Sequence, residues 1–429
     1  MSQVKLFSSS GGARVAKRSG RQKKQKVKKP LKTLAIWLLV ILCLEGLYFF
    51  CIYTNNSFVK KWRTIYINTA MDTMRHQWLA TYFIPKDVID EVRYEYGLVK
   101  AGTVGKESTW GRTDPAPADQ TPSTSDDIIV TLDPNVTHET DQPDAEELTQ
   151  EELEKQAEEN FYSVFWELDR TSMETYLAEH PDTLANGWEH IYINEAGFDD
   201  KGTSIQSTFG EQVLAIDAYN GVLLLRISGK GYRGVLAVGK DPSRLSIEMA
   251  TTLGTAGQLS GTIAEAHNGV LAMNANGFLD PNGAGNGGLL AGYTMSNGKA
   301  YGDHFSAYAY KRIELHEDDL FYIKDALSPV SEDCTDAAEF TPALIVDGKK
   351  IMDDYWTGEQ PRACIGQSEK YEILMLVIEG RYPLEGILGT SVNNCSEILL
   401  QHKCMQAINL DGGSSAMLWF DGEYVTQSS

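Results

Sequence analysis

The sequence predicts an α+β protein, in which a mixed β-sheet domain with flanking helices follows a single transmembrane helix and a helical stalk. Three observations give this expectation. An apolar run occupies residues 34–53, helical spacing of apolar positions fills residues 54–100, and short Val/Leu/Ile runs separated by Gly-rich turns begin near Gly187. With 429 residues, the chain has room for more than one folded unit.

The N-terminus combines a basic tail with the apolar run. Residues 1–33 carry eleven Lys and Arg side chains and no acid. As a helix, the run LAIWLLVILCLEGLYFFCIY is long enough to cross a hydrocarbon layer of ~30 Å. A cleaved signal peptide is the alternative, but the run exceeds a usual signal core and CIYTNNS lacks a small-residue cleavage site. The basic tail predicts a single-pass cell-membrane protein with a cytoplasmic N-terminus and an extracellular C-terminal domain.

Beyond the apolar run the charge reverses. Taking the eleven basic groups and Glu45 from the totals of 38 basic and 59 acidic side chains leaves 27 and 58, a net charge of −31 for residues 54–429. Such acidity argues against nucleic acid as a partner, so an anionic substrate needs a local cationic cluster. No His/Cys cluster has zinc spacing, and no metal or other cofactor is predicted, although surface aspartates leave calcium open.

Composition divides the region after the apolar run into four segments. Residues 54–100 mix aromatic and apolar positions at helical spacing and predict a juxtamembrane helical stalk. Residues 101–143 are rich in Thr, Pro, Asp and Ser with few large apolar groups, which predicts a disordered acidic linker. Helical spacing returns over 144–185, and the β-rich domain is expected over 187–429.

One stretch of the β-rich domain is basic. GVLLLRISGKGYRGVLAVGKDPSR alternates short apolar strands with Gly-rich turns. Its cations are Arg226, Lys230, Arg233, Lys240 and Arg244. A solvated strand face explains this pattern as well as a binding site does, and we favour the solvated face.

The C-terminal third predicts a strand, helix, strand unit. Residues 363–367 and 371–379 read as an antiparallel hairpin, followed by a helix over about 390–402 and a strand over 404–410. A connection of this length joins parallel strands, whose carboxyl ends emerge at one edge of the sheet. Glu379 and Arg381 are therefore expected to face Asp411 across a crevice of the kind in which α/β sheets bind ligands.

Two further segments are expected at this crevice. The hairpin places Arg362 level with Val377, beside the same edge. Upstream, a helix near 259–267 precedes a strand over 269–273 that ends on Asn274. If this strand is parallel and belongs to the same sheet, Asn274 joins the edge as well.

The stretch LDGGSS, which begins at Leu410, has two interpretations. Asp-Gly and Gly-Gly are common turn pairs, so a simple hairpin turn explains it. At a crevice edge, however, Asp411 is a carboxylate placed by its strand, and the N–H groups of Gly412 and Gly413 are free to form an anion-binding nest. Arg362 and Arg381 suit bidentate binding of a phosphate, which Lys binds less specifically.

Four motifs together resemble the phosphodiester glycosidase domain family: GVLAMNANGF, PRACIGQ, LVIEGR and AINLDGGSSAMLWFDGEYV, in that order. The resemblance covers about residues 187–429 and implies cleavage of the bond between a sugar anomeric carbon and a phosphodiester. Bacterial members are often membrane-anchored exopolysaccharide proteins. Glu379 stands where the family usually has Asp, and Asn276 where Gly is common.

The resemblance and the chemistry together assign expected roles. Asp411, Glu379 and Asn274 are expected to be catalytic, with Asp280 a weaker second carboxylate. The phosphate is expected to bind Arg362, Arg381, Gly412 and Gly413, and the sugar Ser414, Ser415 and Asn276. A structural Arg362–Glu379 pair is the alternative for those two residues. For the whole domain, the alternative to an extracellular hydrolase of cell-surface glycopolymers is a non-catalytic module that binds wall polymers or a partner in the same crevice.

Overall fold

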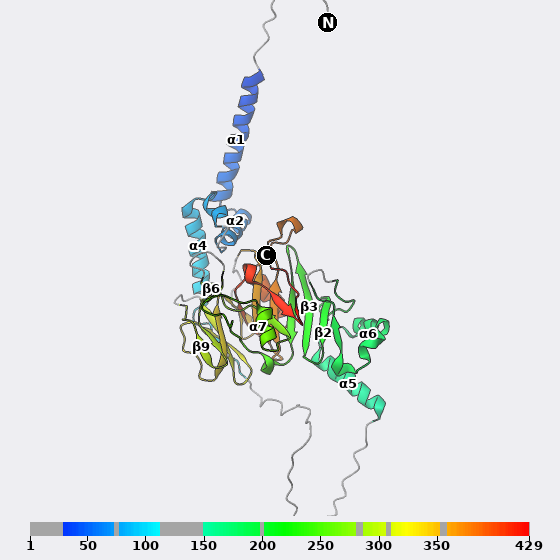
Figure 1. Cartoon of the computed structure of the whole chain (residues 1–429). Helices are drawn as coiled ribbons and strands as arrows, with labels where there is room; N and C mark the ends of the chain where they lie inside the picture. The colour runs from blue at the N-terminus through cyan, green and yellow to red at the C-terminus, as the bar shows by residue number, and fades with distance from the viewer. Residues whose placement is uncertain are drawn as a thin grey trace, which may run out of the picture. The chain divides into compact units, whose positions relative to one another are not determined.

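The computed structural model describes residues 29–72, 77–111, 149–197, 201–279, 286–305, 310–351 and 358–428. The chain forms two compact units, residues 1–59 and 60–429. In the first unit, α1 (Lys29–Tyr53) contains the one described helix, Thr33–Tyr53, that is long and apolar enough to span a membrane (Figure 1). This helix fits the single transmembrane segment predicted from the sequence. Most of the predicted basic tail, residues 1–28, lies outside the described residues.

The elements after α1 are as follows. The helices are α2 (Ser57–Met71), α3 (Trp78–Thr81), α4 (Lys86–Ala101), α5 (Gln150–Val164), α6 (Arg170–Glu179), α7 (Ser260–Ala266) and α8 (Val392–Gln401). Short 3₁₀ turns occupy Pro181–Leu184, Trp188–His190, Pro242–Arg244, Pro383–Glu385 and Gly413–Ser415. The α+β class is confirmed.

The described strands form four sheets in which every neighbouring pair is antiparallel. The nine-stranded sheet runs, in spatial order, β1 (Tyr192–Asn194), β2 (Val213–Asp217), β3 (Val222–Gly229), β4 (Tyr232–Gly239), β16 (Ile373–Ile378), β15 (Arg362–Ser368), β17 (Cys404–Asn409), β13 (Ala343–Val346) and β14 (Lys349–Lys350). The five-stranded sheet runs β11 (Phe321–Asp325), β10 (Lys311–His316), β12 (Cys334–Phe340), β8 (Thr294–Ser296) and β9 (Lys299–Tyr301). The smaller sheets are β19 (Glu423–Tyr424), β18 (Leu418–Phe420) and β5 (Leu271–Met273), and the pair β6 (Phe278–Leu279) and β7 (Leu289–Leu290).

The nine-stranded sheet is buried on both faces. Its central strand β16 is an unbroken apolar run, ILMLVI, and all six residues are buried. Alternate side chains of a strand point to opposite faces, so this run feeds two cores. One face packs on α5, α6 and α8, with Leu374, Leu376 and Ile378 beside Phe161, Met173, Val392 and Leu399 (Figure 1). The other face packs on β10 and β18, with Ile373, Met375 and Val377 beside Ile313, Leu315 and Leu418.

Strands β16 and β17 run in the predicted direction relative to each other, but they are not neighbours in the sheet. Both pair antiparallel with β15, which lies between them, so they run parallel without touching each other. Their carboxyl ends therefore reach the same edge of the sheet, as predicted. Register confirms this, because Arg362 is paired with Ile378, and the N–H of Leu410 donates to the carbonyl of Ala363 at 2.8 Å.

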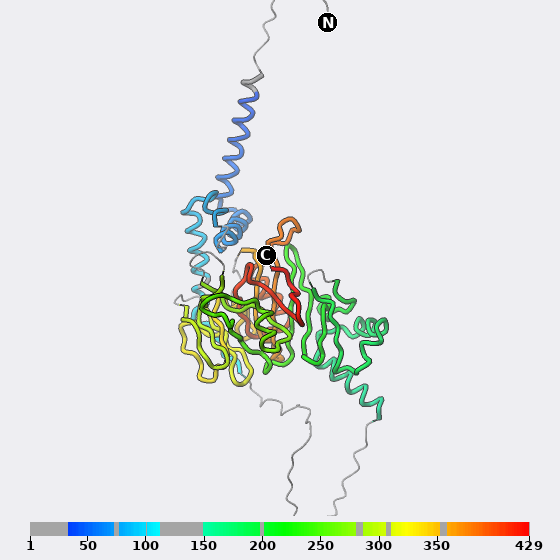
Figure 2. Tube along the Cα trace, viewed as in Figure 1, coloured from blue at the N-terminus to red at the C-terminus, as the bar shows by residue number. Residues whose placement is uncertain are grey.

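The strand before Asn274 does not join the nine-stranded sheet. Instead β5 pairs antiparallel with β18, with Met273 opposite Leu418, so the conditional placement of this strand in the main sheet is wrong. Figure 2 shows the red C-terminal segment beside the green segment that contains β5. The reason is that the chain after Asp411 turns back and offers a new apolar edge to β5. Asn274 still reaches the crevice by this route.

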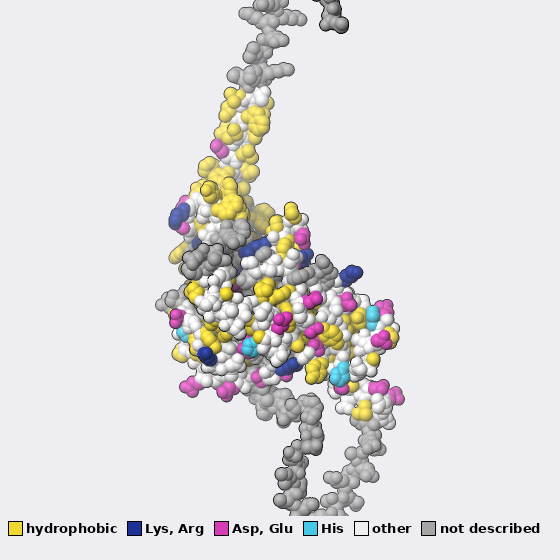
Figure 3. Space-filling view, viewed as in Figure 1, with side chains coloured by type: hydrophobic (Ala, Val, Ile, Leu, Met, Phe, Trp, Pro, Cys, Tyr) yellow, Lys and Arg dark blue, Asp and Glu magenta, His cyan; other side chains and the backbone are white. Residues whose placement is uncertain are grey.

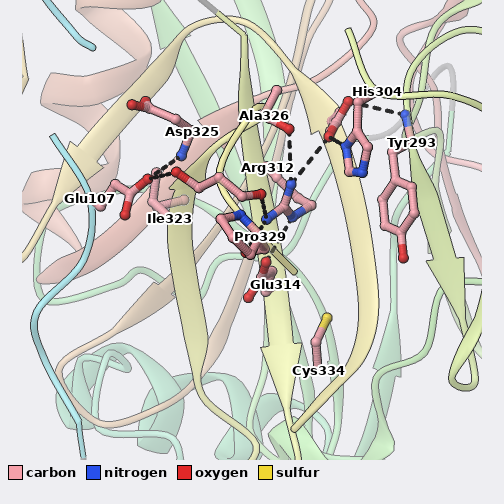
Figure 4. Close-up of polar contacts among 12 residues, drawn as sticks. Glu107, Tyr293, His304, Arg312, Glu314, Ile323, Asp325, Ala326, Pro329 and Cys334 are labelled. Atoms are coloured by element: carbon pink, nitrogen blue, oxygen red, sulfur yellow. Dashed lines mark hydrogen bonds and ion pairs between the residues drawn. The ribbon is translucent and has the colours of Figure 1, made fainter. Parts of the chain in front are cut away.

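Buried charges fill the outer face of the five-stranded sheet (Figure 4). The guanidinium of Arg312, which is fully buried, donates to Glu314 at 2.7 Å, Glu339 at 3.4 Å and the carbonyls of Ala326, Ser328 and Pro329 at 3.2, 2.9 and 3.0 Å. Burial alone would raise the pKa of Glu314, but hydrogen bonds from His316 and Ser331 and the charge of Arg312 lower it to about 2. The alternate side chains of β10, Ile313 and Leu315, point to the opposite face of the sheet and line a cavity. The buried charges therefore lie behind one wall of that cavity.

Part of the predicted linker is ordered. The Lys311 ammonium donates to the carbonyls of Thr103 at 2.7 Å and Lys106 at 2.9 Å, and the N–H of Ser108 donates to Ile323 at 2.9 Å. Residues 103–111 therefore run along β11 and belong to the folded unit. The remainder of the predicted linker, from residue 112, lies outside the described residues up to residue 148.

The basic stretch is not a solvated face at Lys240. This side chain is 6% exposed, and its ammonium contacts Glu167 at 2.6 Å and Glu372 at 2.8 Å. Nearby, Arg233 forms ion pairs with Glu379 and Glu385. The acidic partners come from sequence positions more than 70 residues away, which is why composition alone favoured solvent.

Candidate active site

A cavity of about 1970 Å³ lies at the edge where β16 and β17 end. Nine of the ten predicted site residues line it: Asn274, Asn276, Arg362, Arg381, Asp411, Gly412, Gly413, Ser414 and Ser415. Glu379 does not. The crevice predicted from strand direction therefore exists and collects these side chains.

Asp411 is one of the carboxylates that line this cavity. Its N–H donates to the carbonyl of Ala275 at 3.1 Å, which fixes the backbone where β17 ends. Burial raises the pKa of Asp411 to about 6, although hydrogen bonds from the Ser415 hydroxyl and the Gly412 N–H lower it. The carboxyl group therefore titrates below neutral pH but well above an ordinary Asp. Raised pKa values of this kind are more frequent at functional sites than elsewhere.

The two glycines are required by close packing. A Cβ on Gly412 would lie 2.6 Å from the carbonyl oxygen of Pro361, and Gly413 has a φ of +62°. The predicted anion-binding nest is not formed. The N–H of Gly412 bonds to Asp411, and that of Gly413 donates to Pro361 at 3.0 Å, so neither faces a ligand.

Asn274 holds the loop together. Its Nδ2 donates to the backbone carbonyl of Asp411 at 2.6 Å, and its Oδ1 accepts from the N–H of Met417 at 3.1 Å. One amide therefore clamps both ends of the LDGGSS loop. These contacts hold the loop that carries Asp411, and a catalytic role for Asn274 stays a prediction.

Arg362 is anchored beneath the cavity. The side chain donates from Nε to the carbonyl of Thr390 at 3.1 Å and from Nη2 to the carbonyl of Gly358 at 2.7 Å. The residue is 6% exposed. Its contacts with carbonyl oxygens leave little of the guanidinium for the predicted bidentate phosphate grip, but they fix its charge next to Arg381.

Arg381 presents the more available cation. Among the residues that the structure describes, none accepts a hydrogen bond from its guanidinium or forms an ion pair with it. A Cβ on Gly413 would lie 3.1 Å from its Nη2, so the guanidinium lies over the LDGGSS loop. Burial and the neighbouring charge of Arg362 lower the pKa of Arg381. A guanidinium that has no carboxylate partner among the described residues favours an anion as its ligand.

Glu379 is engaged elsewhere. Its carboxylate accepts from Arg233 Nε at 2.6 Å and from the N–H of Gln427 at 2.6 Å, and the residue is 8% exposed. The expected catalytic carboxylate is thus an ion-pair partner that holds the C-terminal segment. The alternative Arg362–Glu379 pair is not formed either. A left-handed φ of +64° at Arg381 breaks the strand alternation that would otherwise place residues 379 and 381 on one face.

The remaining predicted residues differ in their contacts. Asn276 donates from Nδ2 to the carbonyl of Tyr293 at 3.4 Å, and the residue lines the cavity. Ser414 is exposed, and Ser415 bonds to Asp411. The weaker carboxylate candidate, Asp280, lies outside the described residues. No group of three or more metal-ligating side chains occurs within the described ranges.

Sequence reasoning missed the contribution of the stalk. Asp72, Arg93 and Tyr96, from the segment with α2 and α4, line the same cavity. Arg93 donates to Asp72 at 2.6 Å and lies 4.7 Å from the centre of the Tyr96 ring. No local pattern marks these residues, because only the packing of the helices on the domain brings them there.

The candidate site residues lie in a region that matches a known protein family. The family model described as phosphodiester glycosidase matches residues 267–429. No curated protein matches the chain. A solved structure of the zebrafish N-acetylglucosamine-1-phosphodiester alpha-N-acetylglucosaminidase catalytic domain, auto-inhibited by its pro-peptide, is 15% identical, with 57% of this chain and 83% of that chain covered and a TM-score of 0.40.

Two bacterial structures are similar at the same level. A hypothetical protein from Synechocystis is 15% identical, with 52% of this chain and 62% of that chain covered and a TM-score of 0.34. An exported protein from Burkholderia pseudomallei is 13% identical, with 45% and 70% covered and a TM-score of 0.32. The family match includes β15 to β19 and the LDGGSS loop. Residues 267–429 of this chain therefore match the phosphodiester glycosidase family model, and this stretch carries Arg362, Arg381 and Asp411.

Proposed function

We propose that this chain is a membrane-anchored hydrolase that cleaves sugar-1-phosphodiester bonds in cell-surface glycopolymers. The observation that carries the proposal is the shared cavity, in which the buried carboxyl of Asp411 lies with the guanidinium of Arg381. A carboxylate suits the positive charge that develops on the anomeric carbon, and a cation suits the phosphate that leaves. The family match of residues 267–429 supports the same chemistry.

The reaction assigns one role to each group. The bond between the anomeric carbon and the phosphate oxygen breaks, and the bonding electrons leave with the phosphate. A water oxygen bonds to the carbon, and this water gives one proton to the departing phosphomonoester or to bulk water. Asp411 in its ionised form stabilises or attacks the oxocarbenium-like centre. Arg381 holds the departing phosphomonoester, with Arg362 adding positive potential from below. Because a phosphate departs as a stable anion, a strong general acid is not required.

The supporting residues position these two groups. Asn274 clamps the loop that carries Asp411, and Ser415 orients the carboxylate by a hydrogen bond. Asn276 and Ser414 line the cavity and offer polar atoms to sugar hydroxyls. The apolar helix α1 anchors the chain, with the basic N-terminal tail in the cytoplasm and the domain outside the cell.

Replacing Arg381 by Ala tests the phosphate site. We expect kcat/KM for a sugar-1-phosphodiester to fall by about 10- to 100-fold, because hydrogen bonds to a charged group contribute about 1.5 to 3 kcal/mol. Arg381→Lys should restore part of the loss. Arg170→Ala is the matched control, since Arg170 forms a half-exposed pair with Glu159 and does not line the cavity.

The assay uses the full chain in detergent with a soluble sugar-1-phosphodiester, and it follows release of the phosphomonoester. Unchanged kcat/KM in Arg381→Ala contradicts the assigned role. Absence of turnover in the parent chain, together with retained binding of wall polymer, would replace the hydrolase by the non-catalytic binding module.

The pKa of Asp411 predicts the pH profile. Since the ionised carboxylate is the active form and burial raises its pKa to about 6, kcat/KM should rise with pH through about 6 and level off above it. A pH–rate series between about pH 4 and pH 8 measures this limb. Activity that falls as pH rises through 6 would instead require the protonated carboxyl and would overturn the assignment.

A further inference from the structure

Large aromatic side chains are exposed on α2, on α3 and in the turn that follows α3. We call Trp62, Tyr66, Trp78, Tyr82 and Phe83 the aromatic surface, and their exposed fractions are 49, 43, 48, 81 and 59%. Trp62 and Tyr66 are one turn apart on α2, and the hydroxyl of Tyr66 donates to the carbonyl of Leu79 at 2.8 Å, which joins α2 to α3. Figure 3 shows hydrophobic side chains gathered over the α2 region.

We propose that the aromatic surface rests in the headgroup region of the lipid bilayer. Trp and Tyr are enriched at membrane interfaces, because their rings combine an apolar body with a polar atom. Exposed aromatic groups on this scale are unusual on a surface that meets only water. Lys61 is exposed next to Trp62 and suits anionic headgroups.

Chain length supports lipid as the occupant. Only residues 54–56 separate the end of α1 at Tyr53 from the start of α2 at Ser57. At full extension this connection reaches about 14 Å, so a membrane-spanning α1 keeps the start of α2 close to the bilayer surface. A lipid surface is thus within reach of every copy of the chain, whatever other proteins are nearby.

Other side chains of these helices are buried in the domain, and Arg93 and Tyr96 of α4 line the cavity. Ile65, Ile67 and Asn68 of α2 are buried, and Arg93 of α4 donates to Asn68 at 3.1 Å. Thr69 packs so tightly on Gly358 that a Cβ there would lie 2.2 Å from its Oγ1. The carbonyl of Gly358 accepts the hydrogen bond from Arg362. One layer of helices therefore connects the aromatic surface to the guanidinium below the site.

This arrangement, which rests on the proposed function, also names a substrate class. A cavity whose wall lies on the bilayer meets sugar phosphodiesters carried by membrane lipids before it meets polymer far from the membrane. Among the sugar phosphodiesters of the cell surface, we therefore assign those that are linked to membrane lipids as the substrates.

The first experiment measures lipid contact directly. The full chain is reconstituted in vesicles that contain phospholipids brominated either near the headgroup or near the bilayer centre, and tryptophan fluorescence of the parent is compared with that of Trp78→Phe and Trp62→Phe. The fluorescence lost in each variant should be quenched strongly by bromine near the headgroup and weakly by bromine near the centre. Trp188→Phe is the control, since Trp188 packs beside α5 in the core of the domain.

Two results would contradict the proposal that the aromatic surface contacts lipid. Fluorescence of Trp62 and Trp78 that responds to aqueous acrylamide and not to brominated lipid would show that water covers it. Fluorescence that responds to neither would show that protein, such as a second copy of this chain, covers it.

The second experiment tests the substrate class. The double variant Tyr82→Ser/Phe83→Ser should hydrolyse a vesicle-anchored sugar phosphodiester at least about tenfold more slowly than the parent, with hydrolysis of a soluble analogue unchanged. Tyr219→Ser, which removes an aromatic side chain that is 75% exposed on the β-rich domain, should affect neither substrate. Equal rates on vesicles would reject the lipid-linked class. No hydrolysis of either substrate by the parent would reject the proposed function, and the quenching result would still decide the surface.

Discussion

Replacing Asp411 by Asn is expected to reduce hydrolysis of a sugar-1-phosphodiester by at least about 10³-fold, the scale seen when an essential catalytic group is removed. Asn has a similar shape but cannot carry the negative charge that stabilises or attacks the anomeric carbon. The loss should appear mainly in kcat, because the carboxylate acts most strongly in the transition state. Steady-state kinetics of the full chain in detergent measure the change.

Asp421→Asn is the matched control. It makes the same substitution ten residues further on, at an exposed position outside the cavity where the backbone is left-handed and suits Asn. Its activity should equal that of the parent. Turnover in Asp411→Asn equal to that of the control would remove the catalytic role.

Asp411→Asn should also be more stable than the parent at neutral pH. Burial raises the pKa of Asp411 from 3.8 in the reference state to about 6, so the folded chain favours the protonated carboxyl. That contribution is complete below about pH 4 and is lost as pH rises through 6, with a total of about 3 kcal/mol from the shift. Thermal unfolding of both proteins between pH 4 and pH 8 should show the parent falling behind Asp411→Asn as pH rises.

Replacing Lys240 by Met should cause the largest loss of stability, about 3 to 5 kcal/mol, because breaking a buried ion pair leaves its partners uncompensated. Here the partners are Glu167 and Glu372, which are 1% and 6% exposed and lie within 2.8 Å of the ammonium. Two carboxylates facing each other without a cation must take up a proton. The loss should therefore shrink as pH falls and protonation becomes easier.

Thermal unfolding at several pH values measures this effect, with Lys370→Met as the control. Lys370 lies at the same end of the sheet, 4.6 Å from the centre of the Trp166 ring, and is exposed. Its replacement should cost less than about 1 kcal/mol. Glu372→Gln, which removes only one charge, provides a milder variant if Lys240→Met does not fold. A pH-independent loss equal to that of the control would show that the buried ions contribute nothing.

Strand direction made the position of the site predictable. A hairpin followed by a helix and a strand leaves two strands parallel, and the ends of parallel strands meet at one edge. This reasoning survives although β15 lies between β16 and β17, since two strands that are antiparallel to the same neighbour are parallel to each other. Arg362, Arg381 and Asp411 line one cavity for that reason.

The partners of the polar groups were not predictable in the same way. The sequence predicted that the N–H groups of Gly412 and Gly413 are free. In the structure they donate to Asp411 and to Pro361. The sequence predicted a catalytic Glu379, but in the structure this carboxylate pairs with Arg233, 146 residues earlier in the chain. Hydrogen bonds and ion pairs depend on atoms brought within about 3 Å, and a local pattern does not encode which distant side chain arrives there.

Taken alone, the sequence determined the apolar helix, the α+β class, the resemblance of the C-terminal part to the phosphodiester glycosidase family and the sheet edge at which β16 and β17 both end. These follow from the periodicity of apolar residues and from chain direction, which are local properties. The tertiary structure alone decided that the guanidinium of Arg381 is more available than that of Arg362 and that Asn274 is a clamp. It also decided that Asp72, which follows α2, and residues of α4 line the cavity. Those outcomes depend on packing between segments far apart in the chain, where burial and competing partners set what each polar group can do.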